Sequence, residues 1–316
     1  MTPTVSVIVP AYNAAGFIGR TLESLQAQTC AEFEAIIVDD GSTDATAAVV
    51  RATIESDARF RLIRQPNGGV AAARNRGLAE ASGRYLANLD ADDMWRPTFL
   101  ERTIAALEAA GPDAVFAFAR SLWIDAHDRL LPQVEQALPL SVGYREILLR
   151  NPIGNGSAAL MRTEAVRAVG GYDASLVRDF GQTEDWQLLL QLSWRGRIAA
   201  VAEPLVLYRI LPHSSSHALG RSADAALEVI RRCQAKGPPL RRNDYWTARS
   251  LTLFWLARRA FGLGRANLAF GLAARAYLAN PLWFTLSELR QPVVKRLLRP
   301  FGSGRPASRE IGAPAA

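Results

Sequence analysis

"VSVIVPAYNAAGFIGRTLESLQAQTCAEFEAIIVDDGSTD", residues 5–44, contains two apolar runs rich in β-branched residues, with a helical stretch between them. The runs at 5–12 and 33–40 are almost continuously apolar, which is typical of strands that are buried on both faces. Residues 16–28 favour a helix. Strand, helix and strand in this order are the repeating unit of a parallel sheet with helices packed on its faces.

The same alternation continues along the first part of the chain. Further strands are predicted at 59–64, 84–90 and 114–124, and further helices at 43–56, 69–82 and 97–110. Pro97 is well placed at the start of the last of these helices, because its missing N–H costs nothing there. The sequence therefore predicts an α/β fold with a doubly wound, mostly parallel sheet flanked by helices.

After about residue 138 the alternation loosens. We expect a strand at 157–162, an amphipathic helix at 183–196, and a strand pair or one bent strand at 198–210. Helices are predicted at 222–236, 245–261 and 265–279, the last two forming an αα-hairpin around "GLG". The expected organisation is a catalytic domain at 1–217 with halves at 1–95 and 96–217, a C-terminal helical extension at 218–300, and a disordered tail at 301–316.

Polar side chains follow four of the predicted strands, at the point where each strand ends. They are Tyr12 and Asn13, then Asp39 to Asp44, then Asn67, and then Asp90 to Asp93. Ligands of open α/β sheets bind at the carboxyl ends of the strands. The four strand ends therefore predict one functional site at this edge.

Three carboxylates gather within "YLANLDADDMW", residues 85–95. Uncompensated, Asp90, Asp92 and Asp93 would raise one another's pKa values. Mg²⁺ or Mn²⁺ relieves this repulsion, since these ions bind one or two carboxylates together with water and substrate phosphates. The structural alternative is that Asp92 or Asp93 caps the following helix.

The stretch "VDDGSTD" supports two interpretations. A strand, a glycine turn and a Ser/Thr/Asp helix cap account for Gly41, Ser42 and Thr43. They do not account for two consecutive carboxylates, one of which can accept a hydrogen bond from a nucleobase imide or a ribose hydroxyl. We assign a binding role to one of Asp39 and Asp40, and a structural role to its neighbour.

Together these segments resemble the family 2 glycosyltransferases, which have the GT-A fold. The resemblance covers about residues 4–217 and rests on "VSVIVPAYN", "IIVDDGSTD", "NGGVAAARNRGLAEASGRY" and "LDADD", followed by "NPIGNGSAALMRTEAVRAVGGYD" (151–173) and "TEDWQLLLQL" (183–192). It implies an inverting enzyme that moves a sugar from a nucleotide diphosphate donor to a saccharide or lipid-linked acceptor. Cell-surface polysaccharide or glycolipid assembly is the expected setting.

The resemblance also implies roles for individual residues. Pro10 and Tyr12 line the nucleotide site, Asp40 is the preferred base contact with Asp39 supporting it, and Asp90 lies toward the ribose. Asp92 is the preferred metal ligand, with Asp93 next. Asp185 matches the general base, beside Glu184. Asn67 and Arg74 complete the nucleotide contacts, and His213 is a further candidate metal ligand.

Some of these assignments have plainer alternatives. Without the resemblance, Glu184 and Asp185 are explained by the preference of acids for a helix N-terminus. Arg74 either reaches phosphate or remains a surface charge, and a loop histidine such as His213 is more often solvated than functional.

Two other classes of function compete with a glycosyltransferase. A nucleotidyltransferase would carry a basic, glycine-rich loop after the first strand, yet "PAYNAAGF" has no basic residue before Arg20. A catalytically silent nucleotide-sugar-binding module would not need Asp92 and Asp185. The Gln-x-x-Arg-Trp motif of processive synthases is not matched by "QLSWRG" (191–196), which favours the addition of one or a few sugars.

The basic charge is concentrated near the C-terminal end of the chain. Residues 241–300 hold eleven Lys and Arg and two acidic residues, Asp244 and Glu288. The net positive charge of this segment is therefore larger than the net +7 of the whole sequence. Apolar stretches interleaved with arginine suit peripheral contact with an anionic membrane, for which 284–302 is the stronger candidate. The alternative is a hairpin packed on the catalytic domain or a partner. No nucleic-acid partner is expected.

Two cysteines far apart in sequence, and the lack of a cleavable leader pattern, predict a cytoplasmic protein, with the inner face of the cell membrane as a candidate place of action.

Overall fold

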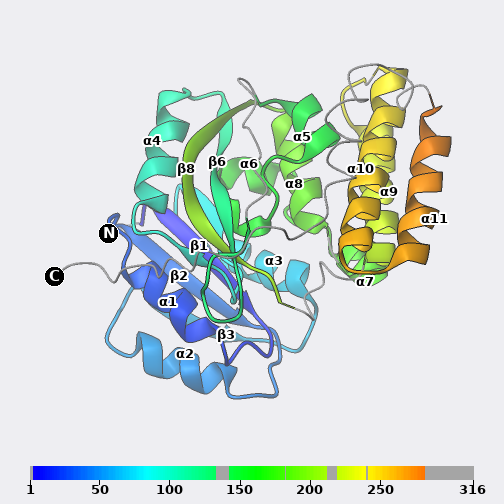
Figure 1. The fold of residues 1–316 in the computed structure, drawn as a ribbon. Coiled ribbons are helices and arrows are strands. Elements are labelled where there is room, and N and C mark those ends of the chain that lie inside the picture. Colours follow the sequence, from blue (N-terminus) through cyan, green and yellow to red (C-terminus); the bar gives the residue numbers. More distant parts are fainter. Residues whose placement is uncertain (1–2, 133–141, 182, 212–218, 240, 282–316) are drawn as a thin grey trace. The chain divides into compact units, whose positions relative to one another are not determined.

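The computed structural model describes residues 3–132, 142–181, 183–211, 219–239 and 241–281. The chain divides into two compact units. Unit 1 comprises residues 1–147 and 151–211, and unit 2 comprises residues 148–150 and 212–316. Each unit is described separately below (Figure 1).

Unit 1 is built on one sheet of eight strands in the order β3-β2-β1-β4-β7-β6-β8-β5. Neighbouring strands among β1 to β4 run parallel, and β6 runs parallel to β8. Strand β7 is antiparallel to both of its neighbours, as β5 is to β8. The predicted mostly parallel α/β sheet is confirmed, and helices flank it in Figure 1. The strands are β1 Val5–Ala11, β2 Phe33–Asp39, β3 Phe60–Arg64, β4 Tyr85–Asn88, β5 Met94–Trp95, β6 Ala114–Ile124, β7 Ala159–Arg162 and β8 Arg197–Arg209.

The helices of unit 1 begin later and end earlier than the sequence predicts. Helix α1 runs from Ile18 to Gln26 because residues 14–17 form a turn first, in which Phe17 N–H donates to the Ala14 carbonyl at 3.0 Å. Helix α3, Val70–Glu80, lies close to β1, since a Cβ on Gly77 would come within 2.5 Å of the Ile8 side chain. The other helices are α2 Thr46–Ile54, α4 Phe99–Ala109, α5 Tyr144–Arg150, α6 Thr163–Ala168, α7 Ala174–Phe180 and α8 Glu184–Ser193, of which α5 extends into unit 2.

Two segments differ from the predicted strands. The stretch at 157–162 starts as a short 3₁₀ helix, Gly156–Ala158, because the Asn155 side chain accepts a hydrogen bond from Ser157 N–H at 3.1 Å. The segment at 198–210 forms one continuous strand, β8, and its register against β6 shifts around Arg120. The strand is therefore bent rather than divided into a pair.

The register of the parallel strands brings their ends together. Ala11 of β1 lies beside Asp39 of β2, which in turn lies beside Arg64 of β3. Ile8 of β1 lies beside Asn88 at the end of β4. The carboxyl ends of all four strands therefore meet at one edge of the sheet, as predicted.

Unit 2 contains the helices α9 Leu219–Lys236, α10 Arg242–Gly262 and α11 Ala266–Ala279. The predicted αα-hairpin is confirmed by α10 and α11, which are joined through Gly264 at φ +71°. Apolar residues of all three helices share one core, including Leu219, Leu253 and Leu272. None of the helices in the described part of the chain has both the length and the apolar content that crossing a membrane requires.

Candidate active site

The loop after β1 carries Tyr12 at a fixed position. Asn13 adopts φ +49°, its N–H donates to Ser42 Oγ at 3.0 Å, and its side-chain oxygen accepts from Thr43 N–H at 2.9 Å. The loop after β1 is thus tied to the loop after β2. Tyr12 is 53% exposed beside these contacts, whereas Pro10 is buried in the strand. An exposed aromatic ring on a rigid turn suits stacking against a planar ligand.

Asp40 organises the loop after β3. Its Oδ1 accepts from Gln65 Nε2 at 2.7 Å and Gly68 N–H at 2.9 Å, and its Oδ2 accepts from Gly69 N–H at 2.8 Å. Two of its three donors are therefore backbone groups, which cannot move away without rearranging the loop that leads into α3. Asn67, which lies between Gln65 and Gly68 in the sequence, is exposed at the same edge of the sheet.

Asp39 has more replaceable partners. It accepts from Ser42 N–H at 2.9 Å and from Arg64 Nε at 2.8 Å. The Asp39 carboxylate is fully buried, but half of the Arg64 side chain is exposed. An ion pair that is open to solvent on one side contributes little stability. A ligand could take the place of Arg64 at lower cost than it could displace the backbone donors of Asp40.

The three carboxylates after β4 occupy different environments. Asp93 is fully buried, and it accepts from Ser157 Oγ at 2.6 Å and from Arg209 N–H at 2.9 Å. Asp90 and Asp92 are partly exposed. Burial, followed by the charges of Asp92 and Asp90, raises the pKa of Asp93 well above its ordinary value. Asp93 thus holds the loop together from inside, and Asp90 and Asp92 face outward.

Asp92 is the carboxylate in this group with the fewest interactions. No other residue in the described part of the chain donates a hydrogen bond to its side chain. Burial and the neighbouring Asp90 charge raise its pKa to about 6. An added cation would remove this repulsion, which makes Asp92 chemically suited to bind one.

Arg74 of α3 connects this carboxylate group to α8. Its guanidinium donates to Asp90 Oδ1 at 2.7 Å and to Glu184 Oε1 at 2.5 Å, and its Cζ lies 5.5 Å from the centre of the Tyr172 ring. Arg74 is only 2% exposed. The predicted alternative of a surface charge is therefore wrong. Arg74 is a buried cation between carboxylates of two different elements.

Glu184 and Asp185 lie at the start of α8, on the other side of Arg74 from Asp90. Burial raises the pKa of Glu184 to about 7, more than the neighbouring Arg74 lowers it. Burial likewise raises the pKa of Asp185, and Arg74 again opposes the shift. Glu184 Oε2 is buried without a hydrogen-bond partner among the described residues. With three carboxyl groups around one cation, the cluster carries an excess of negative charge.

Gly156 closes the cluster from the side of the 3₁₀ turn. A Cβ at this position would lie 2.7 Å from an Arg74 guanidinium nitrogen and 3.5 Å from Asp185 Oδ2. A side chain larger than hydrogen would therefore displace the guanidinium. Gly156, Ser157 and Arg209 are site residues that the sequence reasoning missed, although it noted their segments.

Two of the predicted metal ligands receive no support as ligands from the described residues. His213 lies outside the described residues. Asp93 has both of its oxygens occupied by hydrogen bonds within the protein. Across the described residues, no group of three or more His, Cys, Asp and Glu side chains is arranged to hold a metal ion.

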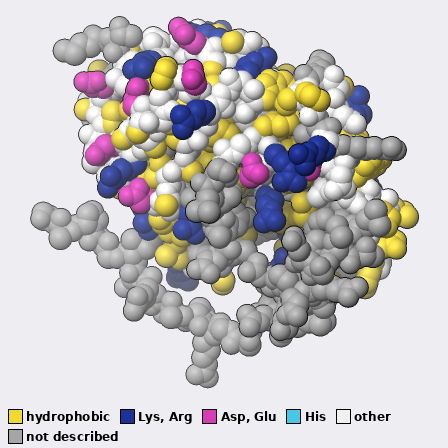
Figure 2. Space-filling view, turned by 90° about the horizontal axis from the view of Figure 1, so that it is seen from above, with side chains coloured by type: hydrophobic (Ala, Val, Ile, Leu, Met, Phe, Trp, Pro, Cys, Tyr) yellow, Lys and Arg dark blue, Asp and Glu magenta, His cyan; other side chains and the backbone are white. Residues whose placement is uncertain are grey.

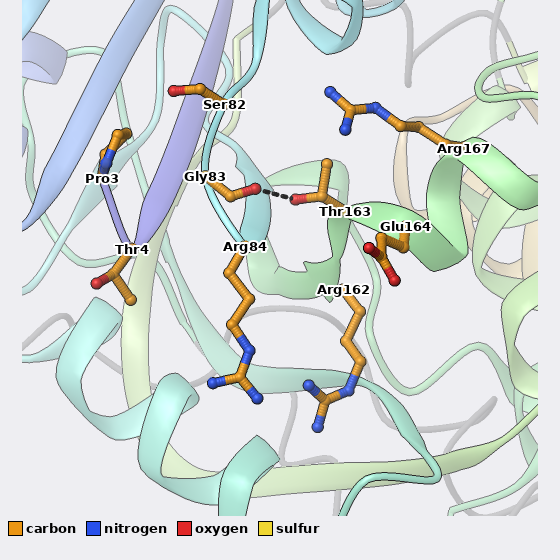
Figure 3. Close-up of a pocket in the computed structure, with 9 residues that line it drawn as sticks. All are labelled: Pro3, Thr4, Ser82, Gly83, Arg84, Arg162, Thr163, Glu164 and Arg167. Carbon is orange, nitrogen blue, oxygen red and sulfur yellow. Dashed lines mark hydrogen bonds between the residues drawn. The ribbon is translucent and has the colours of Figure 1, made fainter. Parts of the chain in front are cut away.

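A pocket of about 540 Å³ lies elsewhere in unit 1. Figure 3 shows it near the first residues of β1 and β4 and the start of α6, which is the opposite end of these strands from the residues described above. Its arginines have structural partners: Arg162 donates to the backbone carbonyls of Gly111 and Ala114, and Arg167 to those of Leu78 and Ala81. This pocket contains none of the predicted site residues.

Comparison with known proteins was made for both the sequence and the structure. Residues 6–170 match Glycosyl transferase family 2. An uncharacterized glycosyltransferase of Nostoc sp. is 31% identical over 233 residues, which cover 71% of this chain and 70% of that protein. Matches to two other relatives cover only 30% and 39% of those proteins.

Two solved structures share the fold. Residues 1–349 of S. aureus TarS, solved in complex with UDP-GlcNAc, align with a TM-score of 0.63 and 20% identity over 87% of this chain and 81% of that one. The mannosyltransferase PcManGT from Pyrobaculum calidifontis, solved with GDP-Man and Mn²⁺, aligns with a TM-score of 0.62 and 19% identity over 94% and 83%. The expected GT-A type of α/β fold is thereby confirmed.

Proposed function

The chain belongs to glycosyl transferase family 2, and from this premise we propose that unit 1 is a cation-dependent, inverting glycosyltransferase. Its donor is a sugar nucleotide with a diphosphate bridge, and its acceptor is a hydroxyl group of a saccharide or a lipid-linked saccharide. The observation that carries the proposal is the buried Arg74, which links Asp90 on the predicted donor side to Glu184 on the predicted acceptor side.

The nucleotide is proposed to lie across the ends of β1, β2 and β3, with its base near Tyr12 and Asn67. We assign the base contact to Asp39 rather than to Asp40, because the exposed Arg64 is the easier of their donors to replace. Asp40 then keeps the loop at 65–69 in place. This reverses the roles suggested by the sequence, which favoured Asp40 as the base contact and Asp39 as its support.

Asp92 is the residue proposed to hold Mg²⁺ or Mn²⁺, and Asp90 is proposed to lie toward the ribose. One or two carboxylates are sufficient for such a cation when water and substrate phosphates supply its remaining ligands. When bound, the cation neutralises charge on the leaving diphosphate. The Mn²⁺ and GDP-Man bound to PcManGT support this assignment by analogy.

Asp185 is the proposed general base. Its carboxylate accepts the proton of the acceptor hydroxyl while the hydroxyl oxygen bonds to the anomeric carbon, and the bond from that carbon to the diphosphate breaks on the opposite face. Arg74 and Glu184 are positioning residues in this scheme. The pair holds the start of α8 against the donor side, and Arg74 opposes the effect of burial on Asp185.

The acceptor is proposed to belong to polysaccharide or glycolipid assembly in the cytoplasm. A nucleotidyltransferase is the less favoured alternative. The first basic residue after β1, Arg20, is paired with Asp128, so it is not free to grip a triphosphate.

The proposal is tested by Asp185→Asn, with release of nucleoside diphosphate from a panel of sugar nucleotides as the assay. Loss of a general base should lower turnover by a factor of roughly 10² to 10⁴, while donor binding stays unchanged. Asp179→Asn is the matched control, since Asp179 is an exposed acid of unit 1 whose ion-pair partner among the described residues is its neighbour Arg178. Unchanged turnover in Asp185→Asn would exclude this residue as the base and favour another mechanism, whereas no turnover by wild type with any sugar nucleotide would favour a binding module.

A further inference from the structure

Exposed large apolar side chains are concentrated in unit 2. Nine such residues are found in the described part of the chain, and seven of them lie between residues 246 and 278. They are Trp246, Trp255, Phe261, Leu263, Phe270, Tyr277 and Leu278. The described part of unit 1, which is much larger, contributes only Tyr12 and Leu130. Isolated exposed apolar residues need no explanation, but a concentration of this kind marks an interaction surface.

The arrangement on α11 is a continuous stripe. Phe270, Ala274, Tyr277 and Leu278 follow a spacing of three or four residues, so they share one side of the helix. The opposite side, with Ala269, Leu272 and Ala276, packs into the core of unit 2. We call this stripe the α11 outer face; Phe261 of α10 and Leu263 of the turn before α11 are exposed as well. A helix that is apolar on both sides must contact something besides its own core.

The charged residues near the α11 outer face indicate which kind of partner it contacts. The sequence has no acidic residue between Asp244 and Glu288, and Arg265 stands exposed at the start of α11. Arg275 is paired with Asp224 of α9 at 3.0 Å, so its charge is met within unit 2. The aromatic and aliphatic groups of the α11 outer face therefore lie in a segment, residues 245–287, whose only charged residues are arginines. In the view of Figure 2, hydrophobic side chains are visible at the right edge and also among the acidic and basic side chains of the remaining surface.

We propose that the α11 outer face binds the surface of an anionic phospholipid membrane. Apolar side chains with basic neighbours insert into the headgroup region, and the basic groups meet lipid phosphates. A second copy of the same face is a poorer partner, because association would bring like charges together without any acid to offset them. The sequence at 281–300 extends the same chemistry, with Trp283, Phe284, Lys295, Arg296 and Arg299 against the single acid Glu288.

The test is co-sedimentation of the full chain with vesicles of phosphatidylcholine alone or mixed with phosphatidylglycerol. The chain should bind the mixed vesicles far better, and added salt should weaken binding. The double variant Phe270→Ser, Leu278→Ser should bind roughly tenfold or more weakly, since each side chain contributes apolar area to the contact. These side chains are 70% and 75% exposed, so the folded core is left intact.

Matched control variants distinguish binding through the α11 outer face from non-specific binding to vesicles. Leu130→Ser removes an exposed leucine of unit 1 and should leave vesicle binding unchanged. Arg265→Glu should weaken binding, whereas Arg51→Glu, an exposed arginine of α2, should not. Thermal unfolding without lipid confirms that each variant is folded.

Four results would overturn the proposal. Equal binding to both kinds of vesicle, or no binding, would exclude recognition of an anionic surface. Full binding by the double variant would place the contact outside α11. If wild type forms an oligomer without lipid and the double variant is monomeric, the face would be assigned to a second copy. None of these readouts depends on turnover, so the proposal can fail while the assigned activity stands.

Discussion

Replacing Glu184 by glutamine should change how the stability of the protein depends on pH. Glu184 is 4% exposed, and burial raises its pKa to about 7 in the folded chain, against an ordinary value of 4.5. The folded protein therefore holds this proton to higher pH than the unfolded chain does. The difference corresponds to a free energy of about 3 kcal/mol between the two ends of the titration.

The sign follows from linkage. The contribution of Glu184 to the free energy of unfolding is fully present below about pH 4.5 and is lost as pH rises to about 7. Glutamine does not titrate, so Glu184→Gln lacks this loss. Relative to wild type, the variant should gain up to about 3 kcal/mol between pH 4 and pH 8, with little further change above that.

Denaturant unfolding across this pH range measures the effect directly, with wild type and variant compared at each pH. Glu164→Gln, a change at an exposed glutamate of unit 1, should run parallel to wild type. A constant difference between Glu184→Gln and wild type would refute the reasoning, because Glu184 would then titrate alike in both states. A relative loss of stability with rising pH would show that pairing with Arg74 outweighs burial.

Four further substitutions test the packing and the binding assignments. Gly156→Ala should destabilise the protein by about 1–3 kcal/mol and reduce turnover, since its Cβ would lie 2.7 Å from a buried guanidinium nitrogen; Gly220→Ala, with open space around its Cβ, is the control for thermal unfolding. Asp39→Asn should weaken donor binding in calorimetry, whereas Asp40→Asn should mainly lower the melting temperature, and the reverse outcome would return the base contact to Asp40. Ser157→Ala should cost about 1–3 kcal/mol in denaturant unfolding because it removes a donor from a buried carboxylate, and an unchanged midpoint would contradict that role.

The sheet and the edge that carries the site could be predicted because both are determined by short contiguous stretches of sequence. Apolar runs identify buried strands, and each polar cluster directly follows the strand that positions it. Asp39, Asp40 and Asp90 could therefore be placed at one edge from sequence alone. The antiparallel insertion of β7 could not, since a four-residue apolar strand carries no mark of its direction.

The inner contacts of the site depend on residues far apart in the chain. Arg74 and Glu184 are separated by 110 positions, and Asp93 and Arg209 by 116. No local pattern distinguishes a buried arginine from an exposed one on the same helix. The burial of Arg74 and the internal role of Asp93 therefore could be seen only in the structure. The same is true of Asp40, which holds the loop at 65–69 through hydrogen bonds.

The central claim is that Asp92 binds a cation that carries a sugar-nucleotide diphosphate. Thermal unfolding of wild type and Asp92→Ala with a panel of nucleoside diphosphates, with and without Mn²⁺, tests it most directly. At least one diphosphate should stabilise wild type only when Mn²⁺ is present, by about 2.7 kcal/mol at a hundredfold excess over Kd, and should fail to stabilise the variant. Equal stabilisation of Asp92→Ala, or none of wild type with any diphosphate and cation, would contradict the claim.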